Sequence, residues 1–253
     1  MANTPPVTDW TTDYDIFDPG YVCDPVPIWN KLRQECPIAH TDRWGGSWLP
    51  TRYEDMQAFV RMVPELSSKE PLVVPPQELD PESEHAEVAA PPITSDPPTQ
   101  IPIRRMILPF FTPKAVAVHR ADTVALCHNL IDQFIDQGSC DGAAQYSQQI
   151  PPRVIANMMG IDASRAGDFV EWVRGVLEIG LTNPEIRLES RGKILGFFSE
   201  MVRERRQNPG DDLISQLIGC ELEGEPVTDT TVIGMCNLLL IAGIDTTWSS
   251  IGA

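Results

Sequence analysis

Basic residues and paired cysteines are both scarce in this 253-residue sequence. The 19 Lys and Arg residues stand against 36 Asp and Glu, which gives a formal charge of −17. Nucleic acid and anionic membranes are therefore not expected as partners, because proteins bind both mainly through clustered Lys and Arg. None of the six cysteines forms a Cys-x-x-Cys pair, which argues against a zinc ribbon or a dithiol redox motif.

Long apolar runs are also missing. The most apolar stretch, Leu238–Ile244, is too short to span a bilayer and is bounded by Asn237 and Asp245. The first nine residues lack the apolar core of a signal peptide. Together with the unpaired cysteines, these absences predict a cytoplasmic protein without a membrane segment.

The distribution of proline predicts two different halves. Nineteen of the 24 prolines lie at or before Pro113, and proline is excluded from helix interiors. We therefore expect residues 1–113 to hold loops, short helices and a small β-sheet, and residues 114–253 to be helical. The fold class is mainly α, with a small β-sheet near the N-terminus.

Turn and capping residues locate the elements more closely. Gly45-Gly46 predicts a β-hairpin, and Thr51 with Glu54 has the spacing of a capping box at a helix start. Thr112-Pro113 predicts the start of one helix that continues to Gly138. The remaining predicted helices are 145–159, 162–181, 184–206, 211–220 and 228–253.

The segment Pro64–Pro98 is rich in proline and in acidic residues. A loop of this length inside a compact domain is often functional, but the same composition also suits a disordered, solvated linker. Composition alone leaves both interpretations open.

The last predicted helix carries a chemical motif. Asp245 and Thr246 follow the small residues Ala242 and Gly243 inside an otherwise apolar helix. Small residues let a flat ligand approach the backbone, and a carboxylate beside a hydroxyl can pass protons through water. Taken alone, the motif favours the simpler interpretation that both polar side chains face solvent or a neighbouring helix.

This motif is the last of an ordered set that spans nearly the whole chain. The earlier members are Asp18-Pro19, Asp24-Pro25, Gly45-Gly46, Ser95–Pro98, Arg104-Arg105, Phe111–Pro113 and Asn208–Ser215. In this order the set resembles the soluble bacterial cytochrome P450 family, the haem-thiolate monooxygenases. The resemblance implies a truncated cytochrome P450 fold, with residues 1–253 as the N-terminal part of a single domain.

The resemblance also implies roles for six residues. Ala242 and Gly243 would lie beside the oxygen-binding position of the haem iron, where Asp245 and Thr246 would deliver protons. Arg104 would bind a haem propionate, and Gln100 stands where the family has His. A glutamine donates a neutral hydrogen bond but no charge, which implies weaker propionate binding at that position.

Two diagnostic elements of the family have no credible match. Glu171–Arg174 and Glu200–Arg203 fit its Glu-x-x-Arg string but come too early, and we interpret them as helical ion pairs. Cys140 mimics the iron-ligating Cys loop with the wrong glycine spacing. No metal ligand is therefore expected in this chain, and the thiolate Cys is expected downstream of Ala253. Apolar residues that continue to Ala253 likewise suggest a chain cut inside a buried helix.

The resemblance implies an oxidoreductase that inserts one oxygen atom of O2 into an apolar organic substrate, with electrons from a ferredoxin or flavodoxin. No nicotinamide or flavin fingerprint occurs in the chain itself. The alternatives are an inactive helical binding or scaffold protein, and a half-enzyme that needs a C-terminal partner chain. The loop 64–98 and the segment 177–184 would roof the pocket. The apolar candidates to line it, each of which core packing explains at least as well, are Val73, Val74, Val88, Ile93, Leu177 and Leu181.

Overall fold

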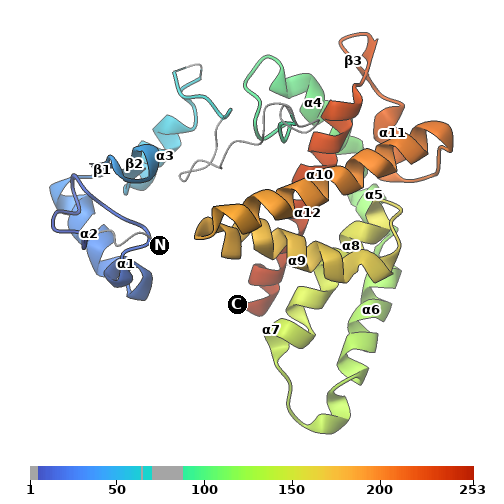
Figure 1. Cartoon of the computed structure of the whole chain (residues 1–253), viewed down its shortest axis with the longest axis horizontal. Coiled ribbons are helices and arrows are strands. Elements are labelled where there is room, and N and C mark those ends of the chain that lie inside the picture. The colour runs from blue at the N-terminus through green and yellow to red at the C-terminus, as the bar shows by residue number, and fades with distance from the viewer. Residues whose placement is uncertain (1–4, 64, 70–87) are drawn as a thin grey trace. The chain divides into compact units, whose positions relative to one another are not determined.

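The structure is a computed structural model that describes residues 5–63, 65–69 and 88–253 (Figure 1). It divides into two compact units, Met1–Pro76 and Gln77–Ala253, which are described separately. Most of the predicted roof loop 64–98, including Val73 and Val74, lies outside the described residues.

The first unit contains the predicted hairpin. Strands β1 (Ile38–Thr41) and β2 (Ser47–Pro50) pair antiparallel, with Ile38 opposite Pro50. Gly45 and Gly46 have φ of 94° and 86°, the left-handed region that glycine adopts without a steric cost. The other elements are α1 (Pro19–Cys23), α2 (Val26–Glu35), η1 (Arg43–Gly45) and α3 (Tyr53–Phe59).

The predicted capping box is wrong. Helix α3 begins after Arg52, and that N-cap makes no side-chain hydrogen bond. The Thr51 hydroxyl instead donates to the carbonyl of Pro37 at 3.0 Å, and its backbone N–H does the same at 2.8 Å. Both groups therefore extend the hairpin pairing and are not available to the helix.

A buried carboxylate holds the start of the chain against the hairpin. Asp15 is only 3% exposed and accepts hydrogen bonds from the Trp44 indole at 2.8 Å and from the Arg43 guanidinium at 3.1 Å. Arg43 also forms two 2.6 Å hydrogen bonds with Asp13. Because Asp15 is both paired and fully hydrogen-bonded, its burial does not leave an uncompensated charge.

The second unit is almost entirely helical. Its elements are α4 (Gln100–Ile107), η2 (Leu108–Phe111), α5 (Pro113–Ala117), α6 (Arg120–Asp132), η3 (Ile135–Gln137), α7 (Gly142–Gln145), η4 (Ser147–Gln149), α8 (Ile150–Met158), η5 (Ala163–Arg165), α9 (Ala166–Leu177), η6 (Ile179–Leu181), α10 (Pro184–Gln207), α11 (Leu213–Ile218), β3 (Glu221–Leu222), β4 (Glu225–Pro226) and α12 (Asp229–Gly252). Side chains of Thr112, Asp212 and Thr228 cap α5, α11 and α12, at the predicted starts.

The single helix predicted from Pro113 to Gly138 is wrong. The structure has three pieces there, α5, α6 and η3. The break follows from a tight turn, because the N–H of His119 bonds the carbonyl of Val116 at 3.1 Å, three residues back. That pattern is a 3₁₀ turn, which ends the α-helical hydrogen bonding of α5.

The core of the second unit forms around α12. Its fully buried side chains include Met235, Leu240 and Ile244, in one cluster with Ile194 and Phe198 of α10. Figure 1 shows α12 running behind α10 and α9, which lie side by side across it. By length and composition α12 could also cross a membrane, with a mean hydropathy of 1.4, but a core helix of a soluble protein passes the same test.

Helices α9 and α10 approach each other through glycine. A Cβ added at Gly175 of α9 would lie 2.0 Å from the Ser190 hydroxyl oxygen of α10. Ser190 is itself buried and cannot move out into solvent. The glycine therefore sets the spacing of this helix pair.

Acid should destabilise the first unit. The pKa of Asp13 is lowered by its hydrogen bond from Arg43, that of Asp9 by the Thr11 hydroxyl, and that of Asp18 by the Val7 N–H. The stability that these groups contribute is fully present above their ordinary pKa of 3.8 and is lost as the pH falls through the lower folded values.

Urea unfolding at a series of pH values, followed by tryptophan fluorescence, measures this loss. Four of the six tryptophans lie in the first unit, so the signal reports mainly on it. Arg43→Gln should flatten the dependence, because Asp13 then loses its partner. An identical pH dependence in wild type and variant would contradict this assignment.

Gly175→Ala should destabilise the second unit. We expect a loss of about 1–3 kcal/mol in the free energy of unfolding, because the methyl group overlaps Ser190. The matched control is Gly192→Ala in α10, where an added Cβ meets no atom within 4 Å. That control should raise the free energy of unfolding by up to about 1 kcal/mol through helix propensity. Stabilisation by both variants in thermal melts would disprove the close approach.

Candidate functional site

Two of the predicted site residues share one exposed side of α12. The Thr246 hydroxyl donates to the carbonyl of Ala242, one turn earlier, at 2.7 Å. Ala242 and Thr246 are both exposed, whereas Ile244 between them is completely buried in the core. The hydroxyl is therefore held at a fixed position over a stretch of helix without bulky side chains.

Asp245 and Gly243 lie differently. Asp245 is half-buried and makes no hydrogen bond or ion pair with any residue that the structure describes. Gly243 points to α8, because a Cβ there would lie 3.2 Å from Cδ1 of Ile155. The structure therefore places Gly243 at a helix contact and leaves the exposed side to Ala242 and Thr246.

Gln100 and Arg104 lie one turn apart on α4. The buried side of that helix, Ile103 and Ile107, belongs to the same core cluster as α12. Arg104 is exposed and has no partner among the described residues. Among the described residues, no hydrogen bond or ion pair joins Gln100 or Arg104 to the Ala242–Thr246 side of α12, so the two groups share a core but not a direct interaction.

This donor set fits haem in two respects. A free guanidinium suits a propionate carboxylate, and the small-residue side of α12 can accept a flat macrocycle. No group of three or more His, Cys, Asp or Glu residues in the described part of the chain could hold a metal ion. Burial raises the pKa of the Cys236 thiol, which keeps it protonated, and Cys140 lies exposed before α7.

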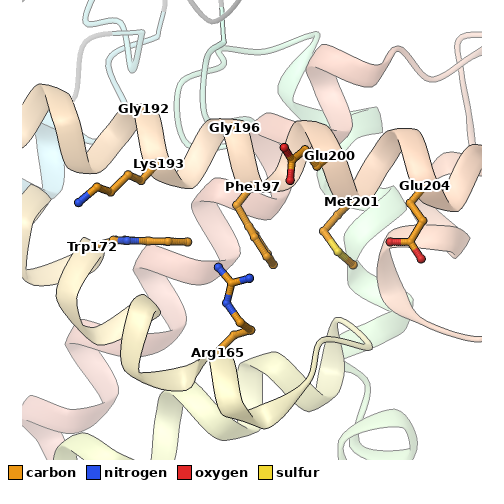
Figure 2. A pocket seen from close by; sticks show the side chains of 9 residues that line it. All are labelled: Arg165, Trp172, Gly192, Lys193, Gly196, Phe197, Glu200, Met201 and Glu204. Atoms are coloured by element: carbon orange, nitrogen blue, oxygen red, sulfur yellow. The ribbon is translucent and has the colours of Figure 1, made fainter.

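The two grooves described in the structure contain none of these residues. The larger, of about 490 Å³, lies between α9 and α10, and Figure 2 shows its lining. The Arg165 guanidinium lies 4.9 Å from the Phe197 ring centre and pairs with Asp168 at 2.5 Å. Lys193 pairs with Glu189 at 2.9 Å. The smaller groove, of about 340 Å³, includes Asp212, which pairs with Arg205 at 2.6 Å.

The predicted pocket-lining residues differ in their surroundings. Val88 is buried and Leu177 packs against the core. Ile93 and Leu181 are exposed. These four residues could not be separated by sequence, because apolar character is common to core and pocket positions.

The predicted helical ion pairs have other partners. Arg174 pairs with Glu178 at 2.7 Å, and Glu171 pairs with Lys193 of α10 at 3.4 Å. No pair joins Glu200 to Arg203 in the described residues. Ion pairing in these helices therefore does not follow the Glu-x-x-Arg spacing.

The sequence analysis missed three polar residues, of which Arg187 and Asn237 are buried and Arg191 is half-buried. Arg187 and Arg191 of α10 lie one turn apart, and Asn237 lies on α12. Asn237 Oδ1 is the one buried side-chain polar atom without a hydrogen bond that the structure identifies in its described part. The sequence carries one signal for this: Arg187 has no acidic residue three or four positions away, so it lacks a partner for a helical ion pair.

No family model matches the chain. It is 25% identical over 243 residues to the polyketide biosynthesis cytochrome P450 PksS of Bacillus subtilis, covering 91% of this chain and 58% of the relative. It is 29% identical over 252 residues to the vitamin D(3) 25-hydroxylase of Pseudonocardia autotrophica, covering 97% of this chain and 60% of the relative.

The chain is also similar to a solved cytochrome P450 structure. Cytochrome P450 CYP109Q5 from Chondromyces apiculatus matches with a TM-score of 0.79 and 26% identity, over 95% of this chain and 59% of that one. The chain thus has the mainly α fold expected from the resemblance. It spans about 60% of the length of the curated relatives that it matches.

Proposed function

We propose that this chain, which is similar to bacterial cytochromes P450, forms the part of a haem-dependent monooxygenase that lies on the O2-binding side of the haem. The observation that supports the proposal most is the 2.7 Å hydrogen bond from Thr246 to the Ala242 carbonyl on an exposed, small-residue side of α12. When bound, haem would supply the activation of O2 for insertion of one oxygen atom into an organic substrate.

The residues of this chain would bind the cofactor and supply protons. Arg104 would bind one propionate as a fixed cation, and Gln100 would add a neutral hydrogen bond. Thr246 would hold a water molecule beside Ala242, and Asp245 would exchange protons with bulk solvent. Gly243 would let α12 pack closely against α8, and this contact would fix the position of Ala242 and Thr246.

The partners follow from the same proposal. We expect an organic small-molecule substrate, O2, and a ferredoxin or flavodoxin as electron donor, in the cytoplasm. The iron thiolate would come from residues outside this sequence. A chain that binds small molecules without oxidising them, or one that needs a C-terminal partner chain, is the second candidate. It differs from the first candidate in having no thiolate ligand to promote O–O cleavage.

The first test is the intact mass of the native polypeptide from its source, together with the coding sequence after Ala253. A mass well above 28.1 kDa, with a Glu-x-x-Arg pair and a glycine-flanked Cys downstream, is the expected result. The purified protein should then show the ferrous carbon-monoxide spectrum of thiolate-ligated haem. A mass of 28.1 kDa, with no partner chain in the preparation, would overturn the proposal of catalysis.

Thr246→Val should divert the reaction. The substitution keeps the side-chain shape but removes the hydroxyl, so we expect product formed per O2 consumed to fall by about 10²-fold, with hydrogen peroxide rising in its place. Thr246→Ser should retain most of the product yield. The matched control is Thr247→Val, an exposed neighbour. Equal yields from all three variants would exclude the proposed role.

A further inference from the structure

Two arginines of α10 lack a counter-charge among the described residues; Arg187 is buried and Arg191 is half-buried. Arg187 is only 7% exposed, and its side chain has neither a hydrogen bond nor an ion pair among the described residues. Burial lowers its pKa, and no acidic group opposes that effect. A lone buried cation is costly unless something compensates it.

Arg191 lies one turn further along the same helix. It donates one hydrogen bond, from Nη2 to the carbonyl of Val88 at 3.0 Å, and forms no ion pair in the described part of the chain. Burial lowers its pKa, and the neighbouring charge of Arg187 lowers it further. The two guanidinium groups therefore oppose each other in a desolvated place, yet both stay charged because the pKa of arginine is so high.

The fold holds both arginines in position. A Cβ at Gly180 would lie 2.6 Å from the Cβ of Arg187, so the turn after α9 closes directly on this residue. Val88, which accepts the bond from Arg191, is itself buried. These contacts fix the Cβ of Arg187 and the carbonyl to which Arg191 donates.

A third polar group lies in the same part of the core. A Cβ at Gly234 of α12 would lie 2.2 Å from the carbonyl oxygen of Ala89, so α12 contacts the residue next to Val88, to which Arg191 donates its hydrogen bond. Asn237 lies one turn after Gly234, is 8% exposed, and leaves its Oδ1 without a donor. Arg191, which makes one hydrogen bond, and Asn237, whose Oδ1 makes none, thus lie near residues 88–89, and Arg187 lies one turn from Arg191.

We infer that Arg187 and Arg191 form an anion subsite that binds an oxyanion group, such as a carboxylate, on an otherwise apolar substrate. Planar guanidinium groups bind carboxylates through paired hydrogen bonds, which is the interaction that this pair lacks. Asn237 would accept a hydrogen bond from a hydroxyl or N–H of the same molecule. The inference rests on the proposed function for its substrate pocket and narrows the substrate to an organic anion.

The test compares an anionic probe with its neutral analogue. Isothermal titration of the purified native-length protein with dodecanoate and with methyl dodecanoate needs no turnover, so it is independent of the haem spectrum. We expect dodecanoate to bind at least about tenfold more tightly than the ester. Arg187→Gln and Arg191→Gln should each lose about tenfold or more of the dodecanoate affinity and little of the ester affinity.

Matched variants separate charge from folding. Arg203→Gln removes an exposed arginine without a described partner from the same helix, and its affinity should stay within about twofold of wild type. Arg187→Lys keeps the charge but loses the planar fork, so it should bind dodecanoate more weakly than wild type even if Arg187→Gln fails to fold. Thermal melts without ligand verify that each compared variant is folded.

Three results would overturn the inference. Equal affinity for acid and ester would show that the site does not recognise charge, and would leave the proposed monooxygenase intact. Equal losses in Arg203→Gln would show a nonspecific charge effect. A gain in dodecanoate affinity on neutralising the acids of residues 78–87 would mean that the chain's own carboxylates occupy the subsite. If the spectrum is not that of thiolate-ligated haem but dodecanoate still binds more tightly than the ester, the proposed oxidation is wrong and the anion subsite remains supported.

Discussion

The packing of α12 against its neighbours is the constraint on which the candidate site depends. Leu240 and Ile244 are buried in the core with Ile194 of α10, and Gly243 lets Ile155 of α8 come close. A helix fixed on these sides has one side left, and that side carries Ala242 and Thr246. Core packing thus decides which backbone carbonyl and which hydroxyl face outward, because each residue's direction along a helix is set by its neighbours.

The packing of α9 against α10 depends on further close contacts. Gly175 and Gly180 bring the end of α9 onto the start of α10, and this brings the arginines of α10 to the edge of the core. A chain with a formal charge of −17 could pair two cations easily at its surface. The burial of Arg187 and the partial burial of Arg191 without an acidic partner therefore follow from the packing of α9 against α10.

Local signals predicted more of this protein than long-range ones. The hairpin around Gly45-Gly46 and the caps at Thr112, Asp212 and Thr228 are each encoded within a few residues, and all are present. The capping box at Thr51 failed because its hydroxyl bonds Pro37, fourteen residues away. No local sequence pattern predicts a hydrogen-bond acceptor that lies so far away along the chain.

The site shows the same division. The motif from Ala242 to Thr246 was visible because its residues are adjacent, and the hydrogen bond between its ends needs only a helix. Arg187 and Asn237 were not identified, because the lack of an acidic residue one turn from Arg187 does not by itself distinguish a buried arginine from a surface one. Only the packing of α9, α10 and α12 distinguishes them.

The bond between Thr246 and Ala242 also sets a direction for hydrogen bonding. A hydroxyl has one proton, and here that proton is already given to a backbone carbonyl. The oxygen of Thr246 therefore offers only lone pairs to whatever lies beside the helix, and it selects a neighbour that brings its own hydrogen. In this arrangement the threonine orients a donor molecule without supplying a proton itself, so a proton consumed at that place has to come from another group.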